Sequence, residues 1–136
     1  RAQGLYSYCQ PENGFQAGRR GDAQNAADCP AYMKPAFLDQ YWRGHQIHEI
    51  ESELARQRSR LDRNRHQILR KDERIAEIRS ELKKNDLPAE RRTSLLNEFN
   101  RLVDEKNALG RENAFAQTEA ERLQMHLDMT LRTFGR

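Results

Sequence analysis

The sequence predicts a mainly α protein, in which a small, disulfide-stapled head of short helices and loops precedes a long antiparallel two-helix coiled-coil hairpin. Three observations predict this fold class: two apolar patterns that repeat at intervals of three and four residues, a proline between them, and an N-terminal segment that carries both cysteines. We expect residues 1–36 to form the head and residues 37–136 the hairpin, with helices over about 36–85 and 88–133.

The composition argues against a large globular core. Charged residues make up 33% of the 136 residues and aromatic residues 7%, which leaves little apolar surface to bury. The regular repeats favour an elongated helical protein over disorder. The net charge is only +3, which is weak support for nucleic-acid binding because such proteins usually present a strongly basic face.

The expected helices have recognisable ends. Pro35 suits the first turn of a helix, where the missing N–H of proline costs no hydrogen bond. The sequence Asp86-Leu87-Pro88 predicts the turn, with Pro88 at the first position of the return helix. Glu90 in that first turn complements the positive end of the helix dipole.

The two repeats place their apolar residues on one stripe of each helix, because residues three and four apart share a helix face. In an antiparallel hairpin the numbers of facing residues have a nearly constant sum. Ile78 with Leu95 gives 173, and Ile75 with Phe99 gives 174. The predicted seam consists of Ile47, Ile50, Leu54, Leu61, Ile68, Ile75, Ile78, Leu95, Phe99, Leu102, Leu109, Leu123 and Leu127.

The same register predicts contacts between flanking charges on one edge of the hairpin. It places Arg74 opposite Glu98 and Arg60 opposite Glu112. Because an exposed ion pair contributes only about 0–1 kcal/mol, we expect these pairs to select the register more than to stabilise it.

Polar residues interrupt the middle of the predicted seam. One interpretation is a solvated spacer, in which long side chains cover the seam while their charges reach water. The other is a second hairpin or a partner helix that completes the bundle there, with Gly110 permitting close approach. Gly110 is equally consistent with a tolerated weak position that costs about 1 kcal/mol. The polar layers are Gln57, Asn64, Lys71, Lys106 and Asn113.

The head contains the only two cysteines, Cys9 and Cys29, among glycines and prolines that indicate short loops and short helices. Their wide separation does not match a zinc or redox motif. A disulfide between them would contribute about 3 kcal/mol on a chain-entropy estimate and would imply an oxidising compartment. Free structural thiols are the alternative.

A basic stretch on the first long helix supplies candidate contacts for a partner or a polyanion: Arg56, Arg58, Arg63 and Arg65. Acidic residues of the facing helix are expected to neutralise much of this charge, so nucleic acid is an unlikely ligand. No sequence pattern for a catalytic nucleophile, phosphate-binding loop, cofactor or metal site stands out. We therefore expect no enzymatic activity.

Five short motifs follow one another in the N-terminal third: Gly4-Leu5-x-x-Tyr8-Cys9, Pro11-Glu12-Asn13-Gly14-Phe15, Gly18-Arg19-Arg20-Gly21, Cys29-Pro30 and Phe37-x-x-x-Tyr41-x-x-Gly44. In this order, roughly residues 3–50 resemble a family of proteobacterial cell-envelope lipoproteins known only as domain of unknown function number 2799. The resemblance implies an exported protein whose lipid anchor lies outside this fragment. It also implies an upstream cysteine as an alternative partner for Cys9 or Cys29.

Together these observations favour a non-enzymatic structural or adaptor component of the bacterial cell envelope. The hairpin would serve contact with an unidentified envelope protein or self-association. The resemblance places such a protein in the periplasm of a Gram-negative bacterium, anchored at the outer membrane. The alternative is a basic helical module that binds nucleic acid or an anionic polymer.

Overall fold

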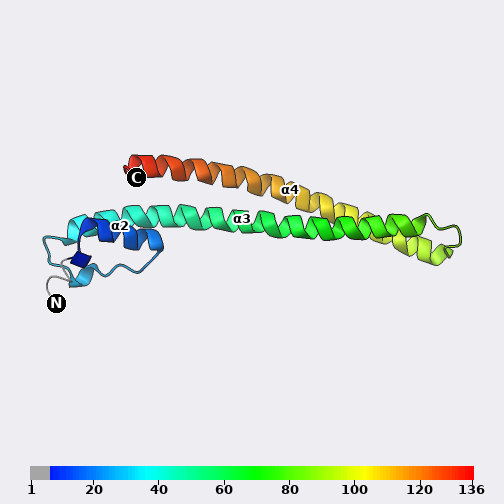
Figure 1. Ribbon diagram of the computed structural model, residues 1–136, viewed down its shortest axis with the longest axis horizontal. Coiled ribbons are helices and arrows are strands. Elements are labelled where there is room, and N and C mark those ends of the chain that lie inside the picture. The colour runs from blue at the N-terminus through cyan, green and yellow to red at the C-terminus, as the bar shows by residue number, and fades with distance from the viewer. Residues whose placement is uncertain (1–6) are drawn as a thin grey trace. The chain divides into compact units, whose positions relative to one another are not determined.

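The protein is mainly α-helical in the computed structural model, which describes residues 7–136 and has no β-strand within them (Figure 1). Helix α2 spans Pro11–Arg20, the short 3-10 helix η1 spans Ala26–Asp28, α3 spans Lys34–Leu82 and α4 spans Ala89–Thr133. The predicted fold class is confirmed: a disulfide-bonded head precedes two long helices that pack as a hairpin. Gly4 and Leu5 of the first motif lie outside the described residues.

The ends of the long helices lie within three residues of their expected places. α3 begins at Lys34, whose N–H bonds to the carbonyl of Pro30 at 3.2 Å. It ends at Leu82 because the next residues form tighter turns and a side chain takes over the carbonyls. The guanidinium of Arg92 donates to the carbonyl oxygens of Leu82 and Lys84, both at 3.1 Å. Such a side chain replaces the hydrogen bonds that a helix end leaves unmade.

The described chain forms two compact units. The first holds the residues up to 55 together with 121–136, and the second holds residues 56–120. The core of the first unit is formed by α2, η1 and the start of α3: Ala17, Ala26, Phe37 and Tyr41, flanked by Tyr8 and Leu38. The core of the second lies near the turn of the hairpin: Ile75, Ile78, Leu95 and Leu102, flanked by Leu82, Leu87, Phe99 and Val103.

Candidate functional site

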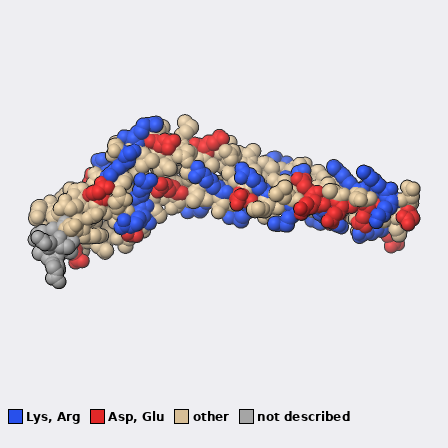
Figure 2. Space-filling model, viewed as in Figure 1, with Lys and Arg blue, Asp and Glu red and all other residues tan. Residues whose placement is uncertain are grey.

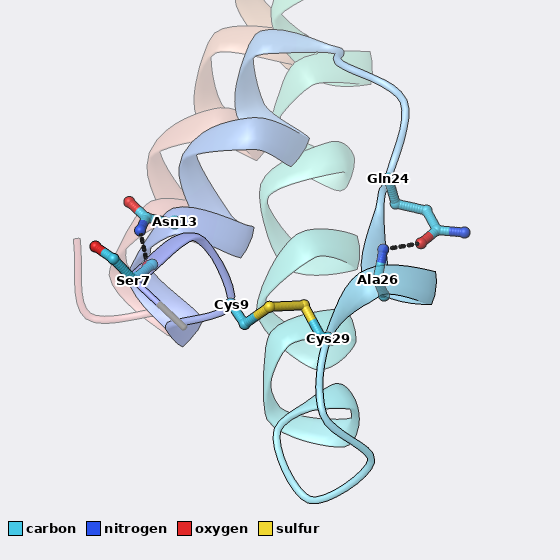
Figure 3. The surroundings of a disulfide bond; sticks show 6 residues. All are labelled: Ser7, Cys9, Asn13, Gln24, Ala26 and Cys29. Carbon is cyan, nitrogen blue, oxygen red and sulfur yellow. Dashed lines mark hydrogen bonds between the residues drawn. A yellow bond between two sulfur atoms is a disulfide. The ribbon is translucent and has the colours of Figure 1, made fainter. Parts of the chain in front are cut away.

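The disulfide of the head joins Cys9 to Cys29, with their Cα atoms 5.8 Å apart (Figure 3). The predicted pairing is therefore confirmed. Both cysteines are buried. Polar side chains order the adjacent turns: the Asn13 amide donates to the Ser7 carbonyl, and the Gln24 side chain accepts the N–H of Ala26 at 3.0 Å.

Helices α2 and α3 approach each other so closely that glycine is required at the contact. A Cβ atom on Gly18 would lie 2.0 Å from the carbonyl oxygen of Tyr41, and one on Gly44 would lie 2.1 Å from that of Phe15. Gly14 is equally confined, since its Cβ would lie 2.5 Å from the Phe37 carbonyl oxygen. Only glycine lets two backbones come this near. The sequence pattern indicated that the head glycines lie in loops between short elements, but Gly14 and Gly18 lie inside α2.

The turn after α2 is a left-handed cap centred on Gly21, which has a φ of 83°. The N–H of Gly21 bonds to Gly18 and that of Asp22 to Ala17, each at 3.0 Å, as in a Schellman motif. The carbonyl of Asp22 then accepts the Tyr41 hydroxyl at 2.5 Å. This contact fixes the loop between α2 and η1 onto α3.

Most of the predicted seam is buried. Three of its residues are only half-buried: Ile68, Phe99 and Leu109. The buried ones are Ile47, Ile50, Leu54, Leu61, Ile75, Ile78, Leu95, Leu102, Leu123 and Leu127. Ile68 and Leu109 flank the polar middle of the second unit, so the apolar contact is weakest there.

The polar layers are held by specific partners. Asn64 is 6% exposed, and its amide donates to Asn113 Oδ1 at 2.8 Å and to Glu112 Oε1 at 2.6 Å. Lys71 Nζ reaches Glu105 at 3.0 Å. Gln57 is half-buried in the same stretch. Asn64 is the buried member of this set, and it would destabilise the hairpin without its partners.

The remaining polar layer pairs Lys106 with Asp72, whose charged atoms lie 2.6 Å apart. The charged ends of Lys71 and Lys106 thus each contact an acidic side chain of the facing helix. Their ammonium groups are consequently neutralised within the second unit.

One edge of the second unit carries a row of cross-helix ion pairs, which we call the ion-pair edge: Arg91–Glu81 at 3.0 Å, Arg74–Glu98 at 2.8 Å and Arg60–Glu112 at 3.9 Å. The residue numbers in each pair sum to 172. Both pairs predicted from the register are therefore present.

Hydrogen bonds from basic side chains lower the pKa of two carboxyl groups in the second unit. The hydrogen bonds from Arg74 hold the pKa of Glu98 below its ordinary value. Those from Lys71, and next from Arg101, lower the pKa of Glu105. Since the charged form of both carboxylates is favoured, the ion pairs Arg74–Glu98 and Lys71–Glu105 persist well below neutral pH.

The four candidate arginines are all exposed, but they are not equivalent. Arg56 and Arg58 each interact with another residue. Arg63 and Arg65 form no ion pair with any residue in the range 7–136. On the face drawn in Figure 2, basic and acidic side chains are interspersed over the helices, so the expected neutralisation is substantial but incomplete.

An open hollow of about 480 Å³, which we call the Gly110 groove, lies in the middle of the second unit. Its lining combines small or apolar residues with polar ones: Ile68, Gly110 and Ala114 with Lys106, Asn107 and Arg111. A Cβ atom on Gly110 would meet nothing within 4 Å. No residue of the described chain therefore accounts for a glycine at this position.

The described residues hold neither a metal cluster nor a membrane span. Within 7–136, no three His, Cys, Asp or Glu side chains are grouped so that they could hold a metal ion. His45 Nε2 instead lies 3.2 Å from Glu49, and His48 Nδ1 lies 3.2 Å from the Arg19 carbonyl. In the same range, no helix combines the length and apolar character that crossing a membrane requires.

A family model described as a protein of unknown function (DUF2799) matches residues 1–46. The match covers about a third of the chain and includes both cysteines and the three glycines of the α2–α3 contact. No significant match was found among curated proteins or among solved structures. The head is thus similar to a family of unknown function, and this similarity does not extend to the part of the hairpin that contains the Gly110 groove.

Proposed function

We propose that this chain is a non-enzymatic adaptor of the bacterial cell envelope, which uses its helical hairpin to contact another protein. The observation that carries the proposal is the open Gly110 groove, which interrupts the weakest part of the seam. A hairpin that served only as a spacer would gain stability from an apolar middle and from alanine in place of glycine. If a second protein packs onto this middle, its polar residues and Gly110 would serve that contact.

The envelope location rests on the head. The Cys9–Cys29 disulfide is typical of an oxidising compartment. The resemblance of the head to envelope lipoproteins supports a periplasmic location with a lipid anchor in the outer membrane. Cell fractionation with thiol trapping tests this location. We expect the two cysteines to resist alkylation in protein taken directly from cells. Reduced protein recovered entirely from the cytoplasm would contradict the proposal.

Protein contact is tested by a photo-reactive amino acid placed in living cells at exposed positions of the second unit, such as Arg63 and Ala108. We expect at least one position to yield a dominant adduct with another protein, identified by mass spectrometry. If no position on the hairpin yields a protein adduct, the adaptor function is refuted.

A second candidate function is binding to nucleic acid or an anionic polymer. It is favoured by one observation, namely that Arg63 and Arg65 have no acidic partner among the described residues. Such binding would weaken steeply with salt, because it releases counterions. The double replacement of Arg63 and Arg65 by Gln should abolish it if these residues carry the contact, whereas an adaptor should keep its protein adduct.

A further inference from the structure

We infer that the Gly110 groove is a docking site for an acidic, amphipathic helix of a partner protein. This inference deepens the proposed function and rests on it, because it names the surface and the chemistry of the partner. It depends on the shape of the groove, the charge of its rim and a comparison with the close helix contact in the head.

The groove has the dimensions of a helix-in-groove contact. The α4 residues that line it extend from Lys106 to Ala114 at helical spacing, which corresponds to about two turns and about 12 Å along the axis. Ile68 supplies the apolar wall from α3. Leu69 beside it is 59% exposed. An amphipathic helix would cover these apolar groups with residues three and four apart.

Gly110 sets the distance of that approach. In the head, Gly18 and Gly44 each stand where the backbone of another helix leaves no room for a Cβ atom. Gly110 also lies inside a helix, but the space over it is empty. A helix that packed there could come as close as α2 comes to α3, which requires small residues on both sides.

The charge of the rim indicates an acidic occupant. Arg111 lines the groove and forms no ion pair within residues 7–136. Arg65, one turn before Ile68 on α3, is unpaired in the same range. Of the neighbouring acids, Asp72 pairs with Lys106 and Glu112 bonds to Asn64, whereas Asp62, one turn before Arg65, forms no ion pair within residues 7–136. Arg111, the unpaired cation that lines the groove, would therefore attract a carboxylate from outside the chain.

A second copy of this chain fits less well. A two-fold symmetric contact buries the same patch on both partners, so the basic rims of both copies would lie in one interface. Like charges in such positions disfavour association. The carboxylates of the ion-pair edge are likewise committed to Arg60, Arg74 and Arg91. The observations thus favour a different, acidic protein.

The test uses photo-crosslinking in cells from two adjacent positions of α4. Asn107 lines the groove, whereas the exposed Ala108 does not, and their side chains point about 100° apart around the helix. We expect a protein adduct from Asn107 at a yield at least fivefold above that from Ala108. The crosslinked peptide should be helical and rich in Asp and Glu.

Two pairs of matched variants connect the adduct to the groove. Gly110→Leu fills the groove and should remove most of the Asn107 adduct, whereas Ala108→Leu should leave it unchanged. Arg111→Glu should lower the yield up to about fivefold, whereas replacement of the likewise exposed Arg63 by Glu should lower it little. Circular dichroism of each purified variant establishes that the helices are intact.

The outcomes separate the inference from the proposed function. A protein adduct that forms equally from Ala108, or that survives Gly110→Leu, would leave the adaptor function standing and overturn the groove as its docking site. Adducts with a second copy, with a basic segment or with nucleic acid would also overturn the inference. If loss of yield is the same for Arg63→Glu and Arg111→Glu, binding follows the net charge of the hairpin and not the groove. The absence of any protein adduct would refute both proposals.

Discussion

The replacement of glycine by alanine should have opposite effects in the two units, although the chemical change is the same. Alanine is favoured over glycine in a helix interior by about 1 kcal/mol. At Gly110 the added methyl group meets nothing within 4 Å, so Gly110→Ala should stabilise the second unit by about this amount. At Gly18 the same methyl group meets the backbone of α3.

The size of the effect at Gly18 follows from two distances. The Cβ atom would lie 2.0 Å from the Tyr41 carbonyl oxygen and 2.7 Å from the His45 nitrogen, and backbone atoms cannot relieve a clash by changing rotamer. α2 must therefore move away by about an ångström. Overpacking costs about 1–3 kcal/mol, and we expect the upper end of this range. After subtraction of the helix-propensity gain, Gly18→Ala should destabilise the first unit by about 2 kcal/mol.

Urea unfolding measured with two signals distinguishes these effects. Trp42, the only tryptophan, lies in the first unit and contacts the rings of Tyr41 and His45, so its fluorescence reports on that unit. Far-ultraviolet circular dichroism reports on all helices. Gly18→Ala should lower the fluorescence midpoint, and Gly110→Ala should leave that midpoint unchanged while raising the dichroism midpoint. If both variants are stabilised to the same extent, the close α2–α3 contact is refuted.

Three other perturbations have defined outcomes. Cys9→Ser removes a disulfide that closes a separation of 20 residues and should lower the fluorescence midpoint by the equivalent of about 3 kcal/mol; insensitivity of the wild type to reductant would argue against this. Because the folded-state pKa of Glu98 is lowered by Arg74, its contribution is present above the ordinary value of 4.5 and is lost as the pH falls below it. The melting temperature of the second unit should fall in that acidic range, and Glu98→Gln should make the fall shallower; an equally steep fall would count against the ion pair. Replacing Lys71 and Lys106 together with Leu should raise the melting temperature, since each exposed ion pair contributes about 0–1 kcal/mol and each buried leucine about 1.5–3 kcal/mol. A lower temperature at unchanged oligomer size would contradict the register.

The hairpin was predictable because its information is local and periodic. A repeat of three and four residues assigns each seam residue to one face, and an antiparallel turn then determines which residues meet. The ion pairs Arg74–Glu98 and Arg60–Glu112 follow from this rule. The two cysteines were predictable as a pair because the sequence contains no other cysteine.

The packing of the head was not predictable in the same way. Gly14 and Gly18 share a face of α2, but nothing in a single sequence shows that Phe37 and Tyr41 lie against them. Glycine in short segments is most often a turn residue, and among the glycines in residues 7–36 Gly21 has that role. The contact depends on the path of the loop between α2 and α3, which has no periodic pattern.

Glycines inside the helices of this chain thus divide into two kinds. Gly14, Gly18 and Gly44 are each explained by a neighbouring backbone within the first unit. Gly110 has the same cost in helix stability, about 1 kcal/mol, but no neighbour in the described chain. If the groove binds a helix, Gly110→Ala should make the hairpin more stable and its partner adduct weaker at the same time. A variant that gains stability and keeps its full adduct would instead identify Gly110 as a tolerated weak position.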